Sequence, residues 1–339
     1  MKGFLVFLIV VSSAGFGGWK FLQAREHRQK WEAIVMPERV ARVRQPMTIE
    51  KLADLLQRTR KLRDRDAFVQ SAREIGLKTV ASGGYSLPKT AGPRELARVF
   101  KQTPDYAKIT FPEGWTGAKM AARLAANGFV HADEFRALVY PAGKTVSPWE
   151  GRLFPDTYDL PRHGSASEIL ATLNRRFEEV RKGLPVSRSR MPKGAGGKAL
   201  TQNEIVILAS LVEGEAREAG ERPLIAGVLL NRLQKKMRLQ CDASVQYVRD
   251  LKTAQGQLPQ GRREKLTLKD LWLESPYNTY RNVGLPPAPI CNPGKSSLLA
   301  ALQPRPSKYF FYVMAPKQNR HLFSETFAGH QKNRVLAAQ

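Results

Sequence analysis

Cysteine is scarce in this chain of 339 residues. Only two are present, Cys241 and Cys291, and neither lies in a CxxC pair or in a Cys/His spacing that could bind a metal. A disulfide-rich scaffold is therefore excluded, and the sequence predicts no metal and no cofactor. The hydrophobic fraction of 42% is enough to fill the cores of more than one domain, which excludes a wholly disordered chain.

Acidic residues are much fewer than basic residues. The chain has 30 Asp and Glu against 55 Lys and Arg, a formal net charge of +25. Such an excess suggests an anionic partner, such as nucleic acid, phospholipid or an acidic polymer. Most of the excess lies in three separated stretches, at residues 20–65, 175–198 and 232–270, and not in one basic tail. Charge alone thus indicates the sign of a partner and does not choose among these classes.

Charge is absent from residues 3–19, and this stretch is the membrane signal of the sequence. We predict a transmembrane anchor at residues 1–22, near the lower limit of about 17 residues for a span, and a juxtamembrane stem at residues 23–37. A cleaved signal peptide is the main alternative and a buried terminal helix the lesser one, but no clear Ala-x-Ala site follows. The basic residues after the span predict a cytoplasmic carboxyl-terminal flank by the positive-inside tendency.

Two segments share a pattern of threonine, lysine and apolar residues. Thr48 and Thr116 each begin a run of the form T-x-x-K-[LM]-A-x-x-L, and a phenylalanine follows in both cases. A threonine at the N-cap and apolar residues on one helical face predict two related helix–loop–helix units, with chance similarity as the alternative. Short extended segments at residues 40–43, 84–87 and 108–111 surround them, so each unit is expected to be a small α+β module.

A helix that is buried nearly all round is predicted after residue 201. Thr201 and Glu204 match a capping box, and aliphatic or small residues fill residues 205–212. With the apolar stripe of this helix on the core side, Glu215 is the next member of the stripe, while Glu213 falls on an adjacent face. Partial burial raises the pKa of a carboxyl group and suits it to general-acid catalysis. A surface glutamate in the last helical turn is the alternative.

Amides, a carboxylate and tyrosines follow in short segments. Asn231 lies within the apolar face of a second buried helix, at residues 221–233. The other candidates are Gln240, Asp242, Tyr247, Tyr277 and Asn278. Aromatic faces and amide groups match the CH groups and hydroxyls of sugar rings. Each segment alone is compatible with ordinary loop chemistry, and together they favour a carbohydrate site.

The ordered motifs of this chain resemble those of the endolytic murein transglycosylase family (MltG, or YceG-like). The resemblance runs from about Thr48 to His330 and rests on ITFPEGWT at 109–116, EGRLFPDTY at 150–158, ASLVEGE at 209–215, GVLLNRL at 227–233, LQCD at 239–242, YNTY at 277–280 and GLPP at 284–287. It implies an α+β chain in which the amino-terminal transmembrane helix is followed by a LysM-like α+β module at residues 38–105 and a larger α+β YceG-like catalytic domain at residues 106–335.

The resemblance also implies a location and partners. The chain would be a single-pass protein of the cell inner membrane with its catalytic domain in the periplasm, or otherwise outside the cytoplasm, which conflicts with the positive-inside count. Peptidoglycan glycan strands would be its substrate and peptidoglycan synthases its candidate protein partners, with no role for nucleic acid. The basic excess would then face anionic lipid headgroups and the carboxylates of wall peptides.

The implied reaction cuts the β-1,4 bond between N-acetylmuramic acid and N-acetylglucosamine of nascent strands and leaves a 1,6-anhydromuramoyl end. One carboxyl group suffices, where most glycosidases use a pair, because the sugar's own 6-hydroxyl attacks in place of water. The resemblance gives this role to Glu215, with Glu213 as runner-up or support, and substrate contact or support to Asn231, Gln240, Asp242, Tyr247, Tyr277 and Asn278. A muramidase-type hydrolase and a non-catalytic peptidoglycan-binding scaffold are the alternatives.

Three positions depart from the family pattern. Gly214 stands where lysine is more usual, and Cys241 and Cys291 stand where serine and alanine are more usual. A glycine between the two glutamates is expected to alter helix rigidity beside the acid. Two cysteines in an oxidising compartment suggest a disulfide that joins two segments of the cleft, and two thiols are equally compatible with the sequence.

Overall fold

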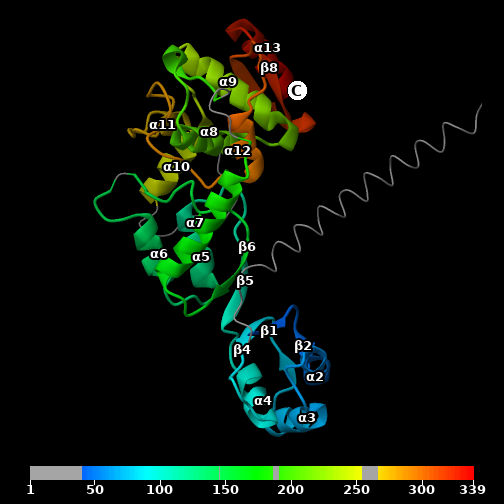
Figure 1. Cartoon of the computed structure of the whole chain (residues 1–339). Coiled ribbons are helices and arrows are strands. Elements are labelled where there is room, and N and C mark those ends of the chain that lie inside the picture. The colour runs from blue at the N-terminus through cyan, green and yellow to red at the C-terminus, as the bar shows by residue number, and fades with distance from the viewer. Residues whose placement is uncertain (1–39, 145, 186–190, 254–265) are drawn as a thin grey trace, which may run out of the picture. The chain divides into compact units, whose positions relative to one another are not determined.

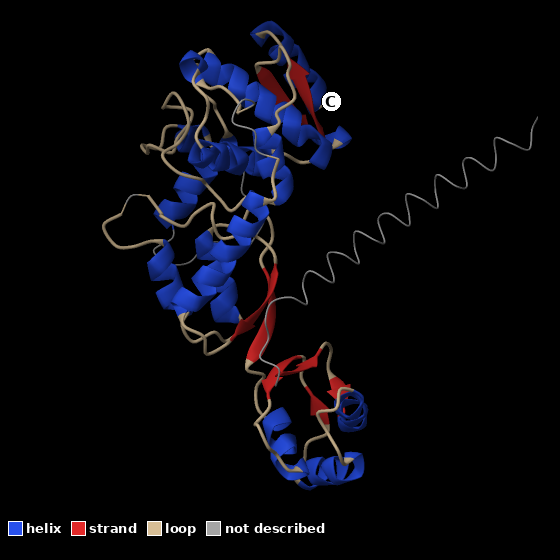
Figure 2. Cartoon of the chain, in the orientation of Figure 1, coloured by secondary structure: helices blue, strands red, loops and turns tan. Residues whose placement is uncertain are grey.

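The computed structural model describes residues 40–144, 146–185, 191–253 and 266–339. The chain divides into two compact units between Ala107 and Lys108, and each unit combines helices and strands (Figures 1 and 2). The fold is therefore mixed α+β. The predicted anchor and stem, residues 1–37, lie outside the described residues. Among the residues that are described, no helix is both long and apolar enough to cross a membrane.

The first unit is a small α+β module whose helices pack on short antiparallel strands. Its elements are β1 (Val40–Val43), β2 (Met47–Thr48), α2 (Ile49–Arg58), α3 (Arg65–Glu74), β3 (Thr79–Val80), β4 (Gly83–Ser86) and α4 (Pro93–Lys101). Strand β1 pairs with β4 from Val40↔Ser86 to Val43↔Gly83, and β2 pairs with β3. Apolar side chains from every helix meet in one core, in which the rings of Tyr85 and Phe100 lie 4.8 Å apart. This core holds the module together.

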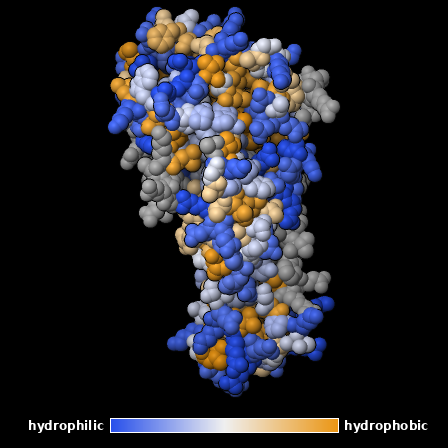
Figure 3. Space-filling model, turned by 90° about the vertical axis from the view of Figure 1, so that its left-hand side faces the viewer, coloured by the Kyte–Doolittle hydropathy of each residue, from blue (hydrophilic) through white to orange (hydrophobic). Residues whose placement is uncertain are grey.

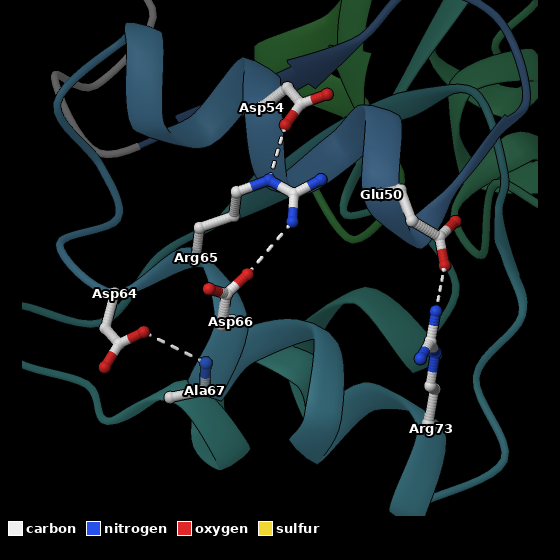
Figure 4. Close-up of polar contacts among 7 residues, drawn as sticks. All are labelled: Glu50, Asp54, Asp64, Arg65, Asp66, Ala67 and Arg73. Carbon is white, nitrogen blue, oxygen red and sulfur yellow. Dashed lines mark hydrogen bonds and ion pairs between the residues drawn. The ribbon is translucent and has the colours of Figure 1, made fainter.

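Ion pairs cross the outer faces of helices α2 and α3 (Figure 4). Arg65 donates to Asp54 at 2.7 Å, and Arg73 donates to Glu50 at 3.0 Å. Asp64 caps α3 by accepting from the backbone N–H of Ala67 at 3.0 Å. Because the paired side chains are well exposed, solvent screens their charges and each pair contributes little to stability. The apolar core, and not these charges, fixes how the two helices pack.

The second unit is larger and mostly helical. Strand β5 (Tyr106–Thr110) contains the division between the units. The later elements are α5 (Gly117–Ala126), α6 (Ala132–Val139), β6 (Thr157–Pro161), α7 (Ala166–Lys182), α8 (Gln202–Glu215), α9 (Arg222–Gln234), α10 (Asp242–Thr253), α11 (Leu268–Leu271), α12 (Lys295–Leu302), β7 (Phe311–Ala315), β8 (Arg320–Ser324) and α13 (Phe327–Ala338). Short 3-10 turns lie at Ala195–Gly197, Ala219–Glu221 and Pro316–Gln318.

Helix α8 lies at the centre of the second unit and packs against α9, α10 and α12 (Figure 1). All eight side chains from Ile205 to Val212 are buried, because the sequence there is apolar on every face. The predicted capping box is confirmed: Thr201 Oγ1 accepts from the N–H of Glu204 at 3.2 Å, and the Glu204 carboxylate accepts from the N–H of Thr201 at 2.7 Å. The chain thus enters the core helix at a defined residue and leaves it at Glu215.

The repeated threonine pattern does mark two pairs of packed helices. Thr48 is the N-cap of α2, which packs on α3, and Thr116 is the N-cap of α5, which packs on α6. Thr116 accepts from the N–H of Lys119 at 3.3 Å, whereas Thr48 caps by its extended backbone without a side-chain bond. The prediction of two helix–loop–helix units is therefore confirmed. Only the first belongs to a small α+β module, because α5 and α6 lie within the larger second unit.

Strands β7 and β8 form an antiparallel hairpin that is covered by α13. Its register runs from Phe311↔Ser324 to Ala315↔Arg320. Side chains directly opposite each other in such a pair share a face, so Tyr312 lies on the same face as Phe323, and Met314 on the same face as His321. Rings on that face are in contact, with centroids 5.4 Å apart for Tyr312 and His321. The hairpin thereby carries a tyrosine toward the end of α8.

Most apolar side chains of the described helices are buried. Figure 3 shows hydrophilic residues over most of one face of the chain, with hydrophobic residues in scattered groups. This agrees with the cores of the two units, where the apolar side chains of the helices are gathered. Among the described residues, charged side chains are mostly at least partly exposed, whereas Glu150 and Arg232 are buried.

Candidate active site

Glu215 is held where three elements of the second unit meet. It is the last residue of α8 and is half-buried. One carboxylate oxygen accepts from the backbone N–H of Ala243, in the first turn of α10, at 3.0 Å. The other accepts from the hydroxyl of Tyr312, on β7, at 3.2 Å. The carboxylate is thus oriented by donors that also stabilise negative charge on it, and the N-terminal end of α10 adds to that stabilisation.

Tyr312 is the residue of this site that sequence reasoning missed. Burial, and next the charge of Glu215, raises the pKa of Tyr312 well above its usual value, so the hydroxyl keeps its proton and acts as a donor. Tyr312 lies 97 positions from Glu215 in the chain, and no motif joins the two. Only the folding of the hairpin onto α8 brings them together.

Further polar groups near Glu215 come from the loop before α10 and from the first residue of that helix. Asp242 Oδ1 accepts from the hydroxyl of Tyr280 at 2.6 Å. Burial and the adjacent Asp242 charge raise the pKa of Tyr280, which therefore remains a donor. Gln240 is exposed and has a left-handed backbone, φ 52°, and its side-chain oxygen accepts from Arg232 at 3.2 Å. Two of the predicted polar residues, Gln240 and Asp242, thus lie on the segment that leads to the amide bound to Glu215.

Glu213 has a different environment from Glu215. Its side chain is only 7% exposed. One carboxylate oxygen accepts from Arg222 at 3.2 Å, and the other accepts from the N–H of Gly294 at 3.1 Å and from the hydroxyl of Ser297 at 2.7 Å. Arg222 also donates to Ser297, at 3.0 Å. With its oxygens bound by three donors, Glu213 joins α8 to the start of α12.

A third glutamate lies against the same turn. Glu113 packs on Gly294 so closely that a Cβ at Gly294 would lie 1.9 Å from a carboxylate oxygen of Glu113. Burial, and then the neighbouring Glu213, raises the pKa of Glu113. The two motifs that contain Glu113 and Glu213 are therefore brought together at Gly294, and only a residue without a side chain fits between them.

Asn231 and Asn278 bind backbone. Asn231 donates to the carbonyls of Ser307 and Tyr309 at 2.8 and 2.9 Å. Asn278 is fully buried and donates to the carbonyls of Leu271 and Leu273 at 3.0 and 2.8 Å. Both amides therefore hold loops in place.

The predicted tyrosines are buried as well. The rings of Tyr247 and Tyr277 lie 5.0 Å apart, and both residues are at most 5% exposed. Burial raises the pKa of Tyr277 to about 12. The amides of Asn231 and Asn278 are thus bound to backbone and the rings of Tyr247 and Tyr277 are buried. Gln240 and Asp242 are exposed, and Glu215, like Asn231, is partly exposed.

Comparison with known proteins identifies the family. The model of the YceG-like family matches residues 41–335. The chain belongs to the YceG-like family. A protein of Bacillus subtilis named endolytic murein transglycosylase is 36% identical over 185 residues, which are 55% of this chain and 47% of that protein. One of the same name from Streptococcus pneumoniae is 25% identical over 370 residues, 97% of this chain and 63% of that protein. The chain thus spans about half to two thirds of these relatives.

A solved structure has a similar fold. The crystal structure of a YceG-like protein from Listeria monocytogenes is 27% identical, with a TM-score of 0.57, and the match covers 87% of this chain and 99% of that one. The α+β architecture described above is therefore one that this family adopts.

Gly214 lies between the two glutamates, Glu213 and Glu215, of this YceG-like chain. A Cβ at Gly214 would lie 2.5 Å from the Cβ of Ala243, closer than two carbon atoms can approach without a shift. Ala243 is also the residue whose N–H binds Glu215. Glycine therefore lets α10 approach α8 closely enough for that hydrogen bond to form, which is a more specific role than a change in helix rigidity.

Under the function proposed below, cleavage of peptidoglycan strands with Glu215 as the acid, we expect Gly214→Ala to lower kcat more than it lowers stability. Alanine gains about 1 kcal/mol of helix propensity over glycine, which partly offsets an overpacking cost of about 1–3 kcal/mol. Displacing Ala243, however, moves a donor away from Glu215, and such a shift costs about 10- to 100-fold in rate. Cleavage of peptidoglycan strands, measured beside urea denaturation, checks this.

The matched control is the exchange of the two side chains. Ala243→Gly keeps the backbone N–H and removes the clashing methyl, so Gly214→Ala with Ala243→Gly should recover most of the lost rate. Wild-type kcat in Gly214→Ala alone would show that the close approach is unimportant for activity.

The two cysteines of this YceG-like chain are buried thiols, and no disulfide joins them. The Cys291 thiol donates to the carbonyl of Ser210 on α8 at 3.4 Å, and the backbone N–H of Cys241 donates to Thr279 at 2.9 Å. Burial, and then the charge of Glu215, raises the pKa of Cys241 well above its usual value. The sequence left open a disulfide or two thiols, and the structure contains two thiols. Both cysteines act as small core residues.

Proposed function

We propose that this chain is a membrane-anchored endolytic lytic transglycosylase of peptidoglycan, with Glu215 as the general acid and then the general base. The observation that carries the proposal is the position of Glu215 at the end of a buried helix, half-buried and bound by two donors, Ala243 N–H and the Tyr312 hydroxyl. Its neighbour Glu213 is engaged by Arg222, Gly294 and Ser297. The names of the relatives from Bacillus subtilis and Streptococcus pneumoniae support the same reaction.

The reaction proceeds on one carboxyl group. Protonated Glu215 gives its proton to the glycosidic oxygen as the bond between the anomeric carbon and that oxygen breaks, and the released sugar leaves as an alcohol. The resulting Glu215 carboxylate then takes the proton of the 6-hydroxyl while that oxygen bonds to the anomeric carbon and closes the 1,6-anhydro ring. Ala243 N–H and the Tyr312 hydroxyl stabilise the carboxylate between the two proton transfers. Glu215 ends protonated, ready for another strand.

Substrate contacts and anchoring belong to the same proposal. Gln240 and Asp242 are proposed to bind the sugar, with Asn231, Tyr247, Tyr277 and Asn278 as support and Glu213 as a positioning residue. The uncharged run at residues 3–19 would hold the enzyme in the inner membrane, and the first unit would serve as the LysM-like glycan-binding module. The carboxyl-terminal unit would then face nascent strands outside the cytoplasm, beside peptidoglycan synthases, with no nucleic acid as partner.

The masses of the cut ends test the proposal. Purified full chain in detergent is incubated with uncrosslinked peptidoglycan strands, and the fragments are analysed by mass spectrometry. We expect 1,6-anhydro ends, each one water lighter than a reducing end. Reducing ends would mean that water attacks and that the chain is a muramidase-type hydrolase. Binding to the strands without any cleavage would indicate a non-catalytic scaffold.

A further inference from the structure

A groove of about 570 Å³ opens beside the hairpin in the second unit. The loop before β7, strand β8 and helix α13 line it. Three of its side chains are exposed cations, Arg305, Lys308 and Arg320, and one is an exposed carboxylate, Glu325. Glu215, Asp242 and Gln240 are not among its lining residues, so the groove is distinct from the site around the catalytic acid.

The cations of the groove are available to a ligand. Within the described part of the chain, the side chains of Arg305 and Lys308 make no hydrogen bond or ion pair, and Arg320 donates only to the side-chain oxygen of Gln318, at 2.9 Å. Three cations on one concave surface repel one another and attract an anion. Arginine binds carboxylates particularly well because its planar fork can donate two parallel hydrogen bonds.

The other walls of the groove indicate what kind of anion fits. Tyr309 and Phe323 line it with rings whose centroids are 5.8 Å apart, which suits the alkyl parts of amino acids. Glu325 would repel a compact polyanion such as pyrophosphate, but it would pair with an amine. Three cations, one carboxylate and an aromatic wall are together complementary to a short peptide with several free carboxylates and one free amine.

The groove shares a residue with the support of the catalytic acid. His321 lines the groove and shares a hydrogen bond with Glu221 at 2.8 Å. Its ring also packs edge-on against Tyr312, with centroids 5.4 Å apart, and Tyr312 donates to Glu215. A ligand in the groove would therefore lie next to the aromatic cluster that orients the acid.

We propose that this groove binds the peptide carried by the glycan strand, with its carboxylates at Arg305, Lys308 and Arg320 and its side-chain amine at Glu325. The inference rests on the proposed function, because only a peptidoglycan substrate carries such a peptide next to the bond that is cut. The groove makes the enzyme selective for strands whose peptides are still present and uncrosslinked at that amine. Strands stripped of peptide remain substrates but have a higher KM.

Two matched triple variants test the proposal in the full chain. The groove variant is Arg305→Gln, Lys308→Gln and Arg320→Gln. The control removes the same charge from helix α7 and the segment after it, with Arg175→Gln, Lys182→Gln and Lys198→Gln. For wild type and control, we expect the KM for peptide-bearing strands to be about tenfold lower than the KM for stripped strands. A tenfold change corresponds to about 1.4 kcal/mol. The groove variant should lose this difference and keep kcat on stripped strands.

The role of Glu325 is tested with the free wall tetrapeptide as the probe. Acetylation of its side-chain amine should weaken binding to wild type several-fold and leave binding to Glu325→Gln unchanged. Inorganic pyrophosphate that competes more strongly than the peptide would overturn the proposal in favour of a phosphate site. An unchanged KM ratio in the groove variant would also overturn it and leave the proposed reaction intact. Peptide binding without cleavage by wild type would support the groove and contradict the reaction.

Discussion

Glu215→Gln should abolish cleavage and leave the protein folded. The amide cannot give a proton to the departing oxygen or take one from the 6-hydroxyl, so the rate of strand cleavage should fall by about 10³-fold or more. The amide oxygen can still accept from the N–H of Ala243, and the Tyr312 hydroxyl can rotate to accept from the new NH2 group. Because both hydrogen bonds can still form, the free energy of unfolding should change by about 1 kcal/mol or less. Glycan binding should persist. Release of anhydromuropeptides from sacculi, read by mass spectrometry, measures the rate.

Glu213→Gln is the matched control for that experiment. It changes the other glutamate of the same motif by the same chemistry, but Glu213 is bound by Arg222, Gly294 N–H and Ser297. Removing the charge leaves Arg222 without its anion and turns an NH2 group toward donors, which should cost about 1–3 kcal/mol of stability. The variant should still cut strands at temperatures where it is folded. If instead Glu213→Gln is inactive while folded and Glu215→Gln still releases anhydromuropeptides, the two assignments are reversed.

Sequence patterns located the helix that ends at Glu215, because its signals are local. The capping box of Thr201 and Glu204 and the apolar run after it depend only on residues a few positions apart, and the structure has both as predicted. The apolar stripe then placed Glu215 at the buried end of the helix. The same reasoning could not tell that Glu213 is bound by Arg222, because that contact depends on how α9 packs against α8.

Residues that reach the acid from far along the chain were beyond sequence reasoning. Tyr312 lies on a hairpin whose register and packing decide which side chain meets α8, and its neighbours give no sign of a function. Polar residues were predicted to contact the sugar or to support the site, and Asn231 and Asn278 have their amides on backbone carbonyls. A loop that must be held in a fixed shape needs such amides as much as a sugar does, and residue type alone does not separate the two roles.

Glu150 is a buried acid that the motif EGRLFPDTY contains and that no functional argument selected. It is 2% exposed. Its carboxyl group accepts from the N–H of Gly117 at 3.1 Å, from the amide of Asn292 at 2.7 Å and from the hydroxyl of Tyr140. Burial raises the pKa of Glu150 to about 7, against these three donors, which lower it. Removal from water thus outweighs the hydrogen bonds, and the acid titrates near neutrality.

The raised pKa of Glu150 makes stability fall as the pH rises from about 4.5 to about 7. Protons bind Glu150 more tightly in the folded chain than in the unfolded chain, whose carboxyl has its ordinary pKa of 4.5. The stabilising contribution is therefore complete below pH 4.5, declines between the two values and is lost above pH 7. Its full size is about 3 kcal/mol, from about 2.5 pKa units at 1.36 kcal/mol each. Urea denaturation of the full chain at pH 5, 6, 7 and 8 gives the profile.

Glu150→Gln isolates this contribution, because glutamine has a similar shape and does not titrate. The difference in unfolding free energy between wild type and variant should shrink by about 2–3 kcal/mol from pH 5 to pH 8, while all other titrating groups cancel. At pH 5 the variant should be the less stable protein, since its NH2 group faces the donors of Gly117 and Asn292. A difference that stays constant with pH would mean that Glu150 is ionised throughout, held by its three donors.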